Sequence, residues 1–212
     1  MSRTRIKICG LTRVDDALAA AHAGADAIGM MLYPPSPRAL TIEAARAIST
    51  ALPPFVSTVA IFVNEPAQNV AAAIALVRPS LLQFHGDETE AYCAQFGLPY
   101  LKAIRVDERL TPGDLLECET RFHSAHGLLL DTLAANVYGG SGETFDWNLI
   151  PPAMRGRIVL SGGLNPLNVS AAVKNIKPWA VDVSSGVESA EKGVKDHMKI
   201  AQFIEAVKNA NV

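Results

Sequence analysis

The sequence predicts an α/β fold in which eight parallel strands and their connecting helices close into one (β/α)8 barrel over residues 1–212. Short apolar runs alternate with segments of helical periodicity along the whole chain. The runs are apolar almost throughout, as expected of parallel strands that are covered on both faces. Alternation alone also fits an open, doubly wound sheet, and the count of eight favours the closed barrel.

The expected strands are short and evenly spaced along the chain. They cover Arg5–Cys9, Asp26–Leu32, Ser57–Val63, Ser80–His85, Tyr100–Val106, Gly127–Asp131, Arg157–Ser161 and Trp179–Ser184.

Helix signals fall between these strands. Capping patterns and prolines mark helix starts at Thr12 with Asp15, Pro66, Asp87 with Glu90, and Asn165-Pro166. Gly24 has the position of a helix C-terminus. The last helix carries the clearest apolar stripe, formed by Ile200, Phe203, Ile204 and Val207. Periodicity is weak over Leu110–Arg121, and the segment after Asp131 is too rich in glycine to begin a helix at once.

Composition excludes several classes of function. A formal net charge of -2 gives no basic stripe for a nucleic acid, so we expect no such partner. No apolar window is long enough to span a membrane, and the first residues do not resemble a signal peptide. The three cysteines, Cys9, Cys93 and Cys118, are odd in number and scattered, which fits a reducing cytoplasm.

Polar and glycine residues gather where the expected strands end. In a barrel, the carboxyl ends of the strands carry the active site. Two of these strand ends, SGGLNP at 161–166 and DVSSGVE at 182–188, combine glycines with hydroxyl groups. Their backbone N–H groups could approach an anion closely, and a phosphate site after the seventh and eighth strands recurs in barrels. Tight turns alone would explain one such loop, but two at these positions favour phosphate.

Four further polar residues are candidates for chemistry, although each has an ordinary structural explanation. Cys9 ends the first strand and could be inert filler. Asp131 ends the sixth strand and could cap a loop. Arg38 could be a surface cation, and His85 a satisfied core histidine.

Taken together, the motifs resemble the phosphoribosylanthranilate isomerase family in order and spacing. The segments that carry the resemblance are KICG (7–10), GMMLYPPSPR (29–38), QFHGDE (83–88), LLLDT (128–132), GGSGETFDW (139–147), LSGGLNPLNV (160–169) and DVSSGVE (182–188). Met30, Met31 and Phe84 depart from the family pattern by apolar exchanges of the kind that cores absorb.

The resemblance implies an Amadori rearrangement of N-(5-phosphoribosyl)anthranilate in tryptophan biosynthesis, with Cys9 as the general base and Asp131 as the general acid. It also implies that Arg38 binds the anthranilate carboxylate. Backbone donors at Gly162, Gly163, Asp182 and Ser184 would hold the phosphate. His85 is expected to be a supporting residue of the site. The substrate nitrogen is itself the electron sink, so no cofactor or metal is expected. The loop containing Gly139, Gly140 and Gly142 is expected to fold over the site.

Lys7 suggests a further hypothesis, because it lies two residues before Cys9 and shares its inward face. A buried ammonium needs a partner, and Asp182 on the eighth strand, beside the first strand in a closed barrel, is the obvious candidate. We expect this pair to bias Cys9 toward the thiolate.

Rival functions make different demands on the residues. Indoleglycerol-phosphate synthase would need a catalytic lysine, for which Lys102 is the candidate, and acidic partners that are not evident. A ribulose-phosphate epimerase would need metal-binding histidines on several strands, and a Schiff-base aldolase would trap substrate on a lysine. A non-catalytic phosphosugar sensor would have lost Cys9 or Asp131. Scattered surface charges favour a monomer and leave a homodimer open.

Overall fold

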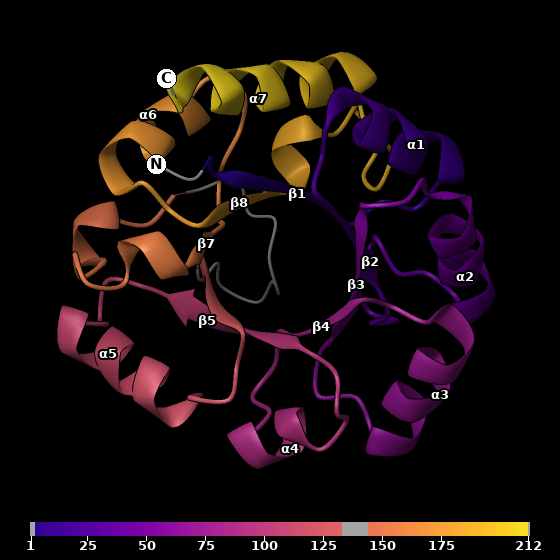
Figure 1. The fold of residues 1–212 in the computed structure, drawn as a ribbon, viewed down its shortest axis with the longest axis horizontal. Coiled ribbons are helices and arrows are strands. Elements are labelled where there is room, and N and C mark those ends of the chain that lie inside the picture. The colour runs from indigo at the N-terminus through magenta and orange to yellow at the C-terminus, as the bar shows by residue number, and fades with distance from the viewer. Residues whose placement is uncertain (1–2, 133–143, 212) are drawn as a thin grey trace.

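The structure is a closed barrel of eight parallel strands in sequence order, surrounded by helices (Figure 1). It is a computed structural model, and it describes residues 3–132 and 144–211. The strands are β1 (Arg5–Cys9), β2 (Ala27–Met31), β3 (Ser57–Phe62), β4 (Leu81–Phe84), β5 (Tyr100–Val106), β6 (Gly127–Thr132), β7 (Val159–Leu160) and β8 (Ala180–Val183). The predicted (β/α)8 barrel is therefore confirmed.

Seven α-helices of the described chain form the outer layer. They are α1 (Val14–Ala23), α2 (Ile42–Ala51), α3 (Ala67–Val77), α4 (Glu90–Ala94), α5 (Pro112–Arg121), α6 (Val169–Ile176) and α7 (His197–Ala210). Three short 3-10 helices complete it: η1 (Trp147–Leu149), η2 (Arg155–Arg157) and η3 (Ser185–Val187). None of the helices in the described residues has the length and apolar character needed to cross a membrane.

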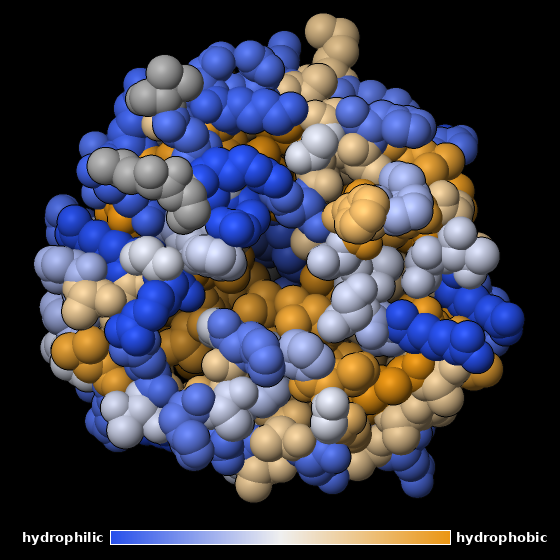
Figure 2. All heavy atoms as spheres, in the orientation of Figure 1, coloured by the Kyte–Doolittle hydropathy of each residue, from blue (hydrophilic) through white to orange (hydrophobic). Residues whose placement is uncertain are grey.

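Alternation along each strand divides the side chains between two cores. On β1, Ile6 and Ile8 belong to the large apolar core that packs against the helices, whereas Lys7 and Cys9 do not. A smaller apolar cluster lies inside the barrel and is formed by Leu101, Ala103, Leu129, Val159 and Ala180. Figure 2 shows one end of the molecule hollowed at its centre, with hydrophobic side chains along one side of the hollow and hydrophilic ones along the other.

The barrel closes where β1 pairs with β8. Lys7 lies opposite Asp182 in this parallel register, and Ile8 lies opposite Val183. The two ends of the chain meet near the same seam, because the Thr4 amide donates a hydrogen bond to Asn211 Oδ1 at 2.9 Å. The seam therefore joins segments that are far apart in the sequence.

Several predicted helix starts were wrong. Thr12 does not cap α1, which begins after Arg13, because the Thr12 hydroxyl donates to the Gly193 carbonyl at 2.6 Å. Thr89, not Asp87, caps α4 by accepting a hydrogen bond from the Tyr92 amide. Turns occupy the residues after Asn165, so α6 begins only at Val169.

Other predictions were confirmed or need small adjustments. Gly24 ends α1 in a left-handed conformation, and Pro66 is the N-cap of α3. The stripe of Ile200, Phe203 and Ile204 is buried on α7. The seventh strand is limited to two residues, since Arg155–Arg157 forms η2.

The weakly periodic helix α5 has the best-defined start. Thr111 Oγ1 accepts a hydrogen bond from the Asp114 amide, and Asp114 accepts one from the Thr111 amide at 2.7 Å. Pro112 stands in the first turn, where a missing N–H has no cost. Local capping therefore compensates for a short apolar face, of which only Leu115 is fully buried.

We expect Thr111→Ala to lower the free energy of unfolding by about 1 kcal/mol, because it removes one half of this capping box. Urea unfolding followed by circular dichroism measures the change. Thr120→Ala, on the exposed face of the same helix, is the control and should cost less. Equal losses in the two variants would show that the cap does not determine the stability of α5.

Candidate active site

One pocket collects the polar side chains at the carboxyl ends of the strands. It is a concave site that is partly open to solvent. It is lined by Cys9, Gly10, Met31, Ser36, Arg38, Gln83, His85, Asp131, Ser161, Gly162, Gly163, Leu164, Asp182, Val183, Ser184 and Ser185. Among the predicted site residues, Lys7 alone does not line it.

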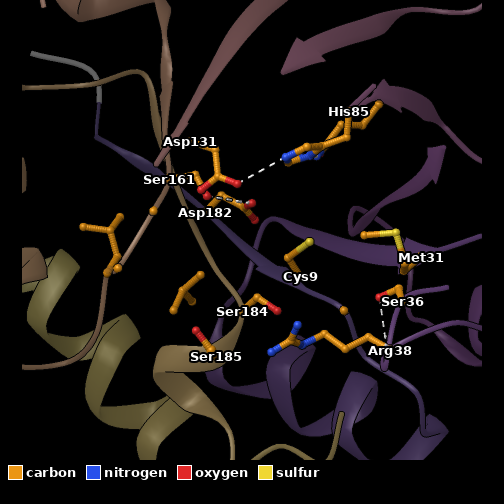
Figure 3. Close-up of a pocket in the computed structure, with 16 residues that line it drawn as sticks. Cys9, Met31, Ser36, Arg38, His85, Asp131, Ser161, Asp182, Ser184 and Ser185 are labelled. Atoms are coloured by element: carbon orange, nitrogen blue, oxygen red, sulfur yellow. Dashed lines mark hydrogen bonds and ion pairs between the residues drawn. The ribbon is translucent and has the colours of Figure 1, made fainter. Parts of the chain in front are cut away.

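Cys9 lies at the centre of this pocket, at the end of β1. Figure 3 shows its sulfur between Asp131 and Asp182 on one side and Arg38 and Ser184 on the other. Gly29 of β2 makes room for it, since a Cβ at Gly29 would stand 3.0 Å from Cys9 Sγ. The thiol thus occupies space that a neighbouring side chain would otherwise fill.

Lys7 lies deeper in the barrel and is paired as predicted. Its Nζ donates to Asp182 Oδ1 at 2.9 Å, and both side chains are almost fully buried. Ser161 also contacts Asp182, at 3.4 Å (Figure 3). Burial alone would lower the pKa of Lys7, but Asp182 and Cys9 together raise it above its ordinary value. Lys7 is therefore a buried cation beside the thiol.

The effect on Cys9 differs in net direction from the hypothesis. Burial raises the pKa of the Cys9 thiol, and the Asp182 carboxylate raises it further. Lys7 and Lys195 lower it, as expected of nearby cations, but they do not outweigh the other two effects. The pKa of Cys9 is therefore above its ordinary value, and Lys7 and Lys195 only limit the rise.

Asp131 faces the same pocket from β6 and is bound to His85. His85 Nε2 and Asp131 Oδ2 are 3.2 Å apart, and both side chains are buried (Figure 3). On its other side, His85 Nδ1 lies 3.0 Å from Gln83 Nε2. If the Gln83 amide donates there, His85 Nε2 carries the proton and donates to Asp131. His85 is thus held in place by Gln83 on one side and by Asp131 on the other.

The two glycine-containing loops border the pocket with unpaired amides. The backbone N–H groups of Gly162, Gly163 and Ser184 donate no hydrogen bond to any residue within 3–132 and 144–211. Gly162 has a φ of 85°, and a Cβ there would stand 2.2 Å from Thr132 Oγ1. These features suit an anion-binding loop. The Asp182 backbone instead lies within β8, and its carboxylate binds Lys7.

Arg38 enters the pocket from the loop after β2 and is held by a residue that the sequence did not single out. Its Nε and Nη2 donate to the two carboxylate oxygens of Glu188 at 2.6 and 2.8 Å. Lys195 Nζ binds the same carboxylate at 3.1 Å. Burial alone would raise the pKa of Glu188, but Arg38 and Lys195 hold it at about 2. Glu188 is therefore ionised across the neutral range.

The sequence missed Gln83, Glu188, Lys195 and Gly29. Gln83 shares the inward face with His85, so strand periodicity could have indicated it, but no spacing rule links Arg38 to Glu188. Gly139, Gly140 and Gly142 lie outside the described residues.

Lys102, the candidate lysine of a synthase, does not face the pocket. Its Nζ binds Glu88 Oε2 at 3.0 Å and the Gly86 carbonyl at 2.6 Å, and it lies over the Phe122 ring of the helical layer.

Fold and pocket together define a (β/α)8-barrel enzyme with its site at the carboxyl ends of the strands. The model of the N-(5'phosphoribosyl)anthranilate (PRA) isomerase family matches residues 6–206. The chain belongs to this family.

Relatives of known name agree along the whole chain. It is 54% identical over 204 residues to the N-(5'-phosphoribosyl)anthranilate isomerase of Thiobacillus denitrificans, covering 96% of this chain and 98% of that one. The enzyme of the same name from Pseudomonas fluorescens is 50% identical, with 100% and 99% covered. The crystal structure of the Thermotoga maritima isomerase matches with a TM-score of 0.86 at 41% identity, covering 97% and 99%.

We expect Lys7→Met to raise the pKa of Cys9 further, because it removes a cation and leaves Asp182 without its partner. The ultraviolet absorbance of the thiolate, titrated with pH and corrected with Cys9→Ser, measures the change. Thiolate formation should move to higher pH. Lys102→Met, at a second buried lysine that is paired with Glu88, is the matched control. If the thiolate of Lys7→Met forms at the same pH as in the wild type, or if Lys102→Met shifts it equally, Lys7 does not act specifically on the thiol.

Proposed function

We propose that the chain is the isomerase that converts N-(5-phosphoribosyl)anthranilate into 1-(2-carboxyphenylamino)-1-deoxyribulose 5-phosphate, a step in tryptophan biosynthesis. Family membership over residues 6–206 supports the reaction. The observation that carries the mechanism is that Cys9 and Asp131 line one pocket at the carboxyl ends of the strands. A solved relative, 40% identical with a TM-score of 0.83, is described in complex with the reduced form of this product.

The rearrangement needs one acid and one base. Asp131 donates a proton to the furanose ring oxygen, the C1′–oxygen bond breaks, and the substrate nitrogen lone pair forms an iminium with C1′. The Cys9 thiolate removes the proton from C2′, and the electron pair of that bond gives an enolamine. Protonation at C1′ and loss of the enol proton then yield the ketone, without change of net charge.

The raised pKa of Cys9 limits how much of the base is in its reactive form. Because the pKa of Cys9 is raised by burial and by Asp182, the thiol is the main form near neutral pH. The reactive thiolate is then a minor form, and Lys7 and Lys195 prevent it from becoming rarer still. We therefore assign Lys7 a supporting role through the field at Cys9, and His85 a supporting role through its contact with Asp131.

The two ends of the substrate would be bound by different groups of residues. We assign the anthranilate carboxylate to Arg38, whose planar guanidinium suits a carboxylate. The phosphate is assigned to the amides of Gly162, Gly163 and Ser184, with Asp182 bordering the sugar through its carboxylate. No cofactor or metal enters the scheme, because the substrate nitrogen accepts the electrons itself.

We expect Cys9→Ala and Asp131→Asn each to lower kcat/KM by about 10²–10⁴-fold, the range for removal of a general acid or base. Loss of phosphoribosylanthranilate fluorescence measures the rate. The control is Cys93→Ala, since Cys93 is buried against the helices rather than in the pocket. Full activity in both site variants would overturn the mechanism, and a wild type that binds the product analogue but does not consume the substrate would favour a phosphosugar sensor.

The oligomeric state and location also belong to the proposal. One solved relative is described as a monomeric form of the dimeric Thermotoga maritima isomerase. Here Phe55, between α2 and β3, is fully exposed with a φ of 70°. It borders a hollow at the amino ends of the strands, whose apolar lining includes Val59, Leu101 and Val159. These features favour a homodimer through this face over the monomer that the sequence favoured. The free cysteines fit the cytoplasm.

We expect the wild type to sediment at twice the 22.6 kDa chain mass and Phe55→Glu at the chain mass, because a charge would be buried in the interface. Analytical ultracentrifugation measures both. Leu167→Glu is the matched control, since Leu167 is a second large apolar residue that is almost fully exposed. A wild type that sediments as a single chain would restore the monomer.

A further inference from the structure

Arg38 needs an orienting partner, because its long side chain extends into the pocket from a loop. The Arg38 backbone amide donates to Ser36 Oγ at 3.2 Å within the same short segment (Figure 3). An arginine side chain has many rotamers, and fixing them on binding costs free energy. A site that recognises a planar carboxylate gains affinity when the guanidinium is already in place.

Glu188 is fixed independently of Arg38. Its Oε1 accepts hydrogen bonds from Lys195 Nζ at 3.1 Å and from the Gly193 amide at 3.2 Å. Its backbone carbonyl accepts one from Lys199 Nζ at 2.8 Å, and its amide donates to the Ser185 carbonyl. The carboxylate therefore has a defined position before Arg38 binds to it.

The contact with Glu188 leaves the outer edge of the guanidinium free. A guanidinium carries five N–H donors in one plane, and Glu188 takes one from Nε and one from Nη2. Arg38 lines the pocket, and within the described residues its Nη1 donates to no partner. The stem is confined as well, since Arg38 Cδ lies 2.6 Å from the place of a Cβ on Gly10. Two parallel bonds and a confined stem set the plane of the group.

Lys195 keeps Glu188 from neutralising Arg38 completely. The Lys195 side chain has no solvent exposure and shares Glu188 Oε1 with Arg38 Nε. Its Nζ also binds the Ser184 carbonyl at 3.0 Å, which ties this cluster to the loop after β8. One carboxylate thus serves two cations, and positive charge remains for an anion in the pocket.

We propose that Glu188, held by Lys195 and the Gly193 amide, is a positioning residue that aims the free edge of Arg38 at the carboxylate of the substrate. Glu188 thereby sets the preference for an aromatic amine that bears a carboxylate. This inference rests on the role proposed above for Arg38. It assigns Glu188 no contact with the reacting atoms.

The test compares two inhibitors that differ only in the carboxylate. One is the reduced product analogue, 1-(2-carboxyphenylamino)-1-deoxyribulose 5-phosphate reduced at its ketone, and the other lacks the ring carboxylate. The measured quantity is a ratio, the inhibition constant of the inhibitor without the carboxylate divided by that of the inhibitor with it. A large ratio therefore means a strong preference for the carboxylate. Glu188→Asp keeps the charge but withdraws it by one methylene, so it should lower the ratio about tenfold by releasing Arg38. Affinity for the inhibitor without the carboxylate should change little.

Two further variants give the experiment its controls. Glu88→Asp makes the same change in the other buried glutamate–lysine pair, at Lys102, and should leave the ratio unchanged. In an Arg38→Met background, Glu188→Asp should have no further effect on the ratio, because it acts through Arg38.

The failures can be told apart. If Arg38→Met alone leaves the ratio unchanged, the carboxylate role of Arg38 is wrong, and the role of Glu188 fails with it. If Arg38→Met lowers the ratio but Glu188→Asp does not, only the positioning role is overturned. An equal loss of affinity for both inhibitors in Glu188→Asp would show a merely structural role and would also overturn it.

Discussion

The buried ion pair between Lys7 and Asp182 links the strands that close the barrel. The two residues are 175 positions apart in the chain, and they are brought together only when β8 pairs with β1. Their side chains are nearly inaccessible to water, so removing either partner would leave an uncompensated charge in the interior. Cys9 lies two residues after Lys7 on β1, Ser184 lies two residues after Asp182 just beyond β8, and both positions in the pocket depend on the same register.

The pocket combines several charged contacts in a small volume, and each has a different consequence. Asp182 stabilises Lys7 but raises the pKa of Cys9, so one member of the pair that secures the seam opposes formation of the thiolate while Lys7 favours it. Lys195 acts in the other direction on Cys9 and at the same time supports Glu188. Closure, thiol chemistry and anion recognition are therefore not independent in this barrel.

Much of the fold followed from apolar runs alone. β1 and β5 have their predicted bounds, and strand alternation correctly placed Lys7 inside the barrel. Caps were less predictable, because a side chain such as Thr12 can bind a distant carbonyl instead of its own helix. No helix was predicted over Ile42–Ala51, although Thr41 caps it.

The site was predictable in its residues and less so in its energetics. The strand ends and the motifs indicated Cys9, Asp131 and Arg38, all of which line the pocket. The sequence could not weigh burial against charge at Cys9, because that balance depends on how deeply the sulfur is enclosed. Nor could it pair Arg38 with Glu188, since the contact spans 150 positions and depends on a loop.

The hydrogen bond between Thr4 and Asn211 has a consequence for the order in which the barrel can assemble. In the natural connectivity, the seam is the pairing with the greatest separation along the chain, and closing so long a loop has the largest entropic cost. Joining the two ends and opening the chain in a surface connection on the far side, such as that between α3 and β4, would make the seam a local contact. The last pairing to form would then move to the new break, while the ring of strands kept its geometry.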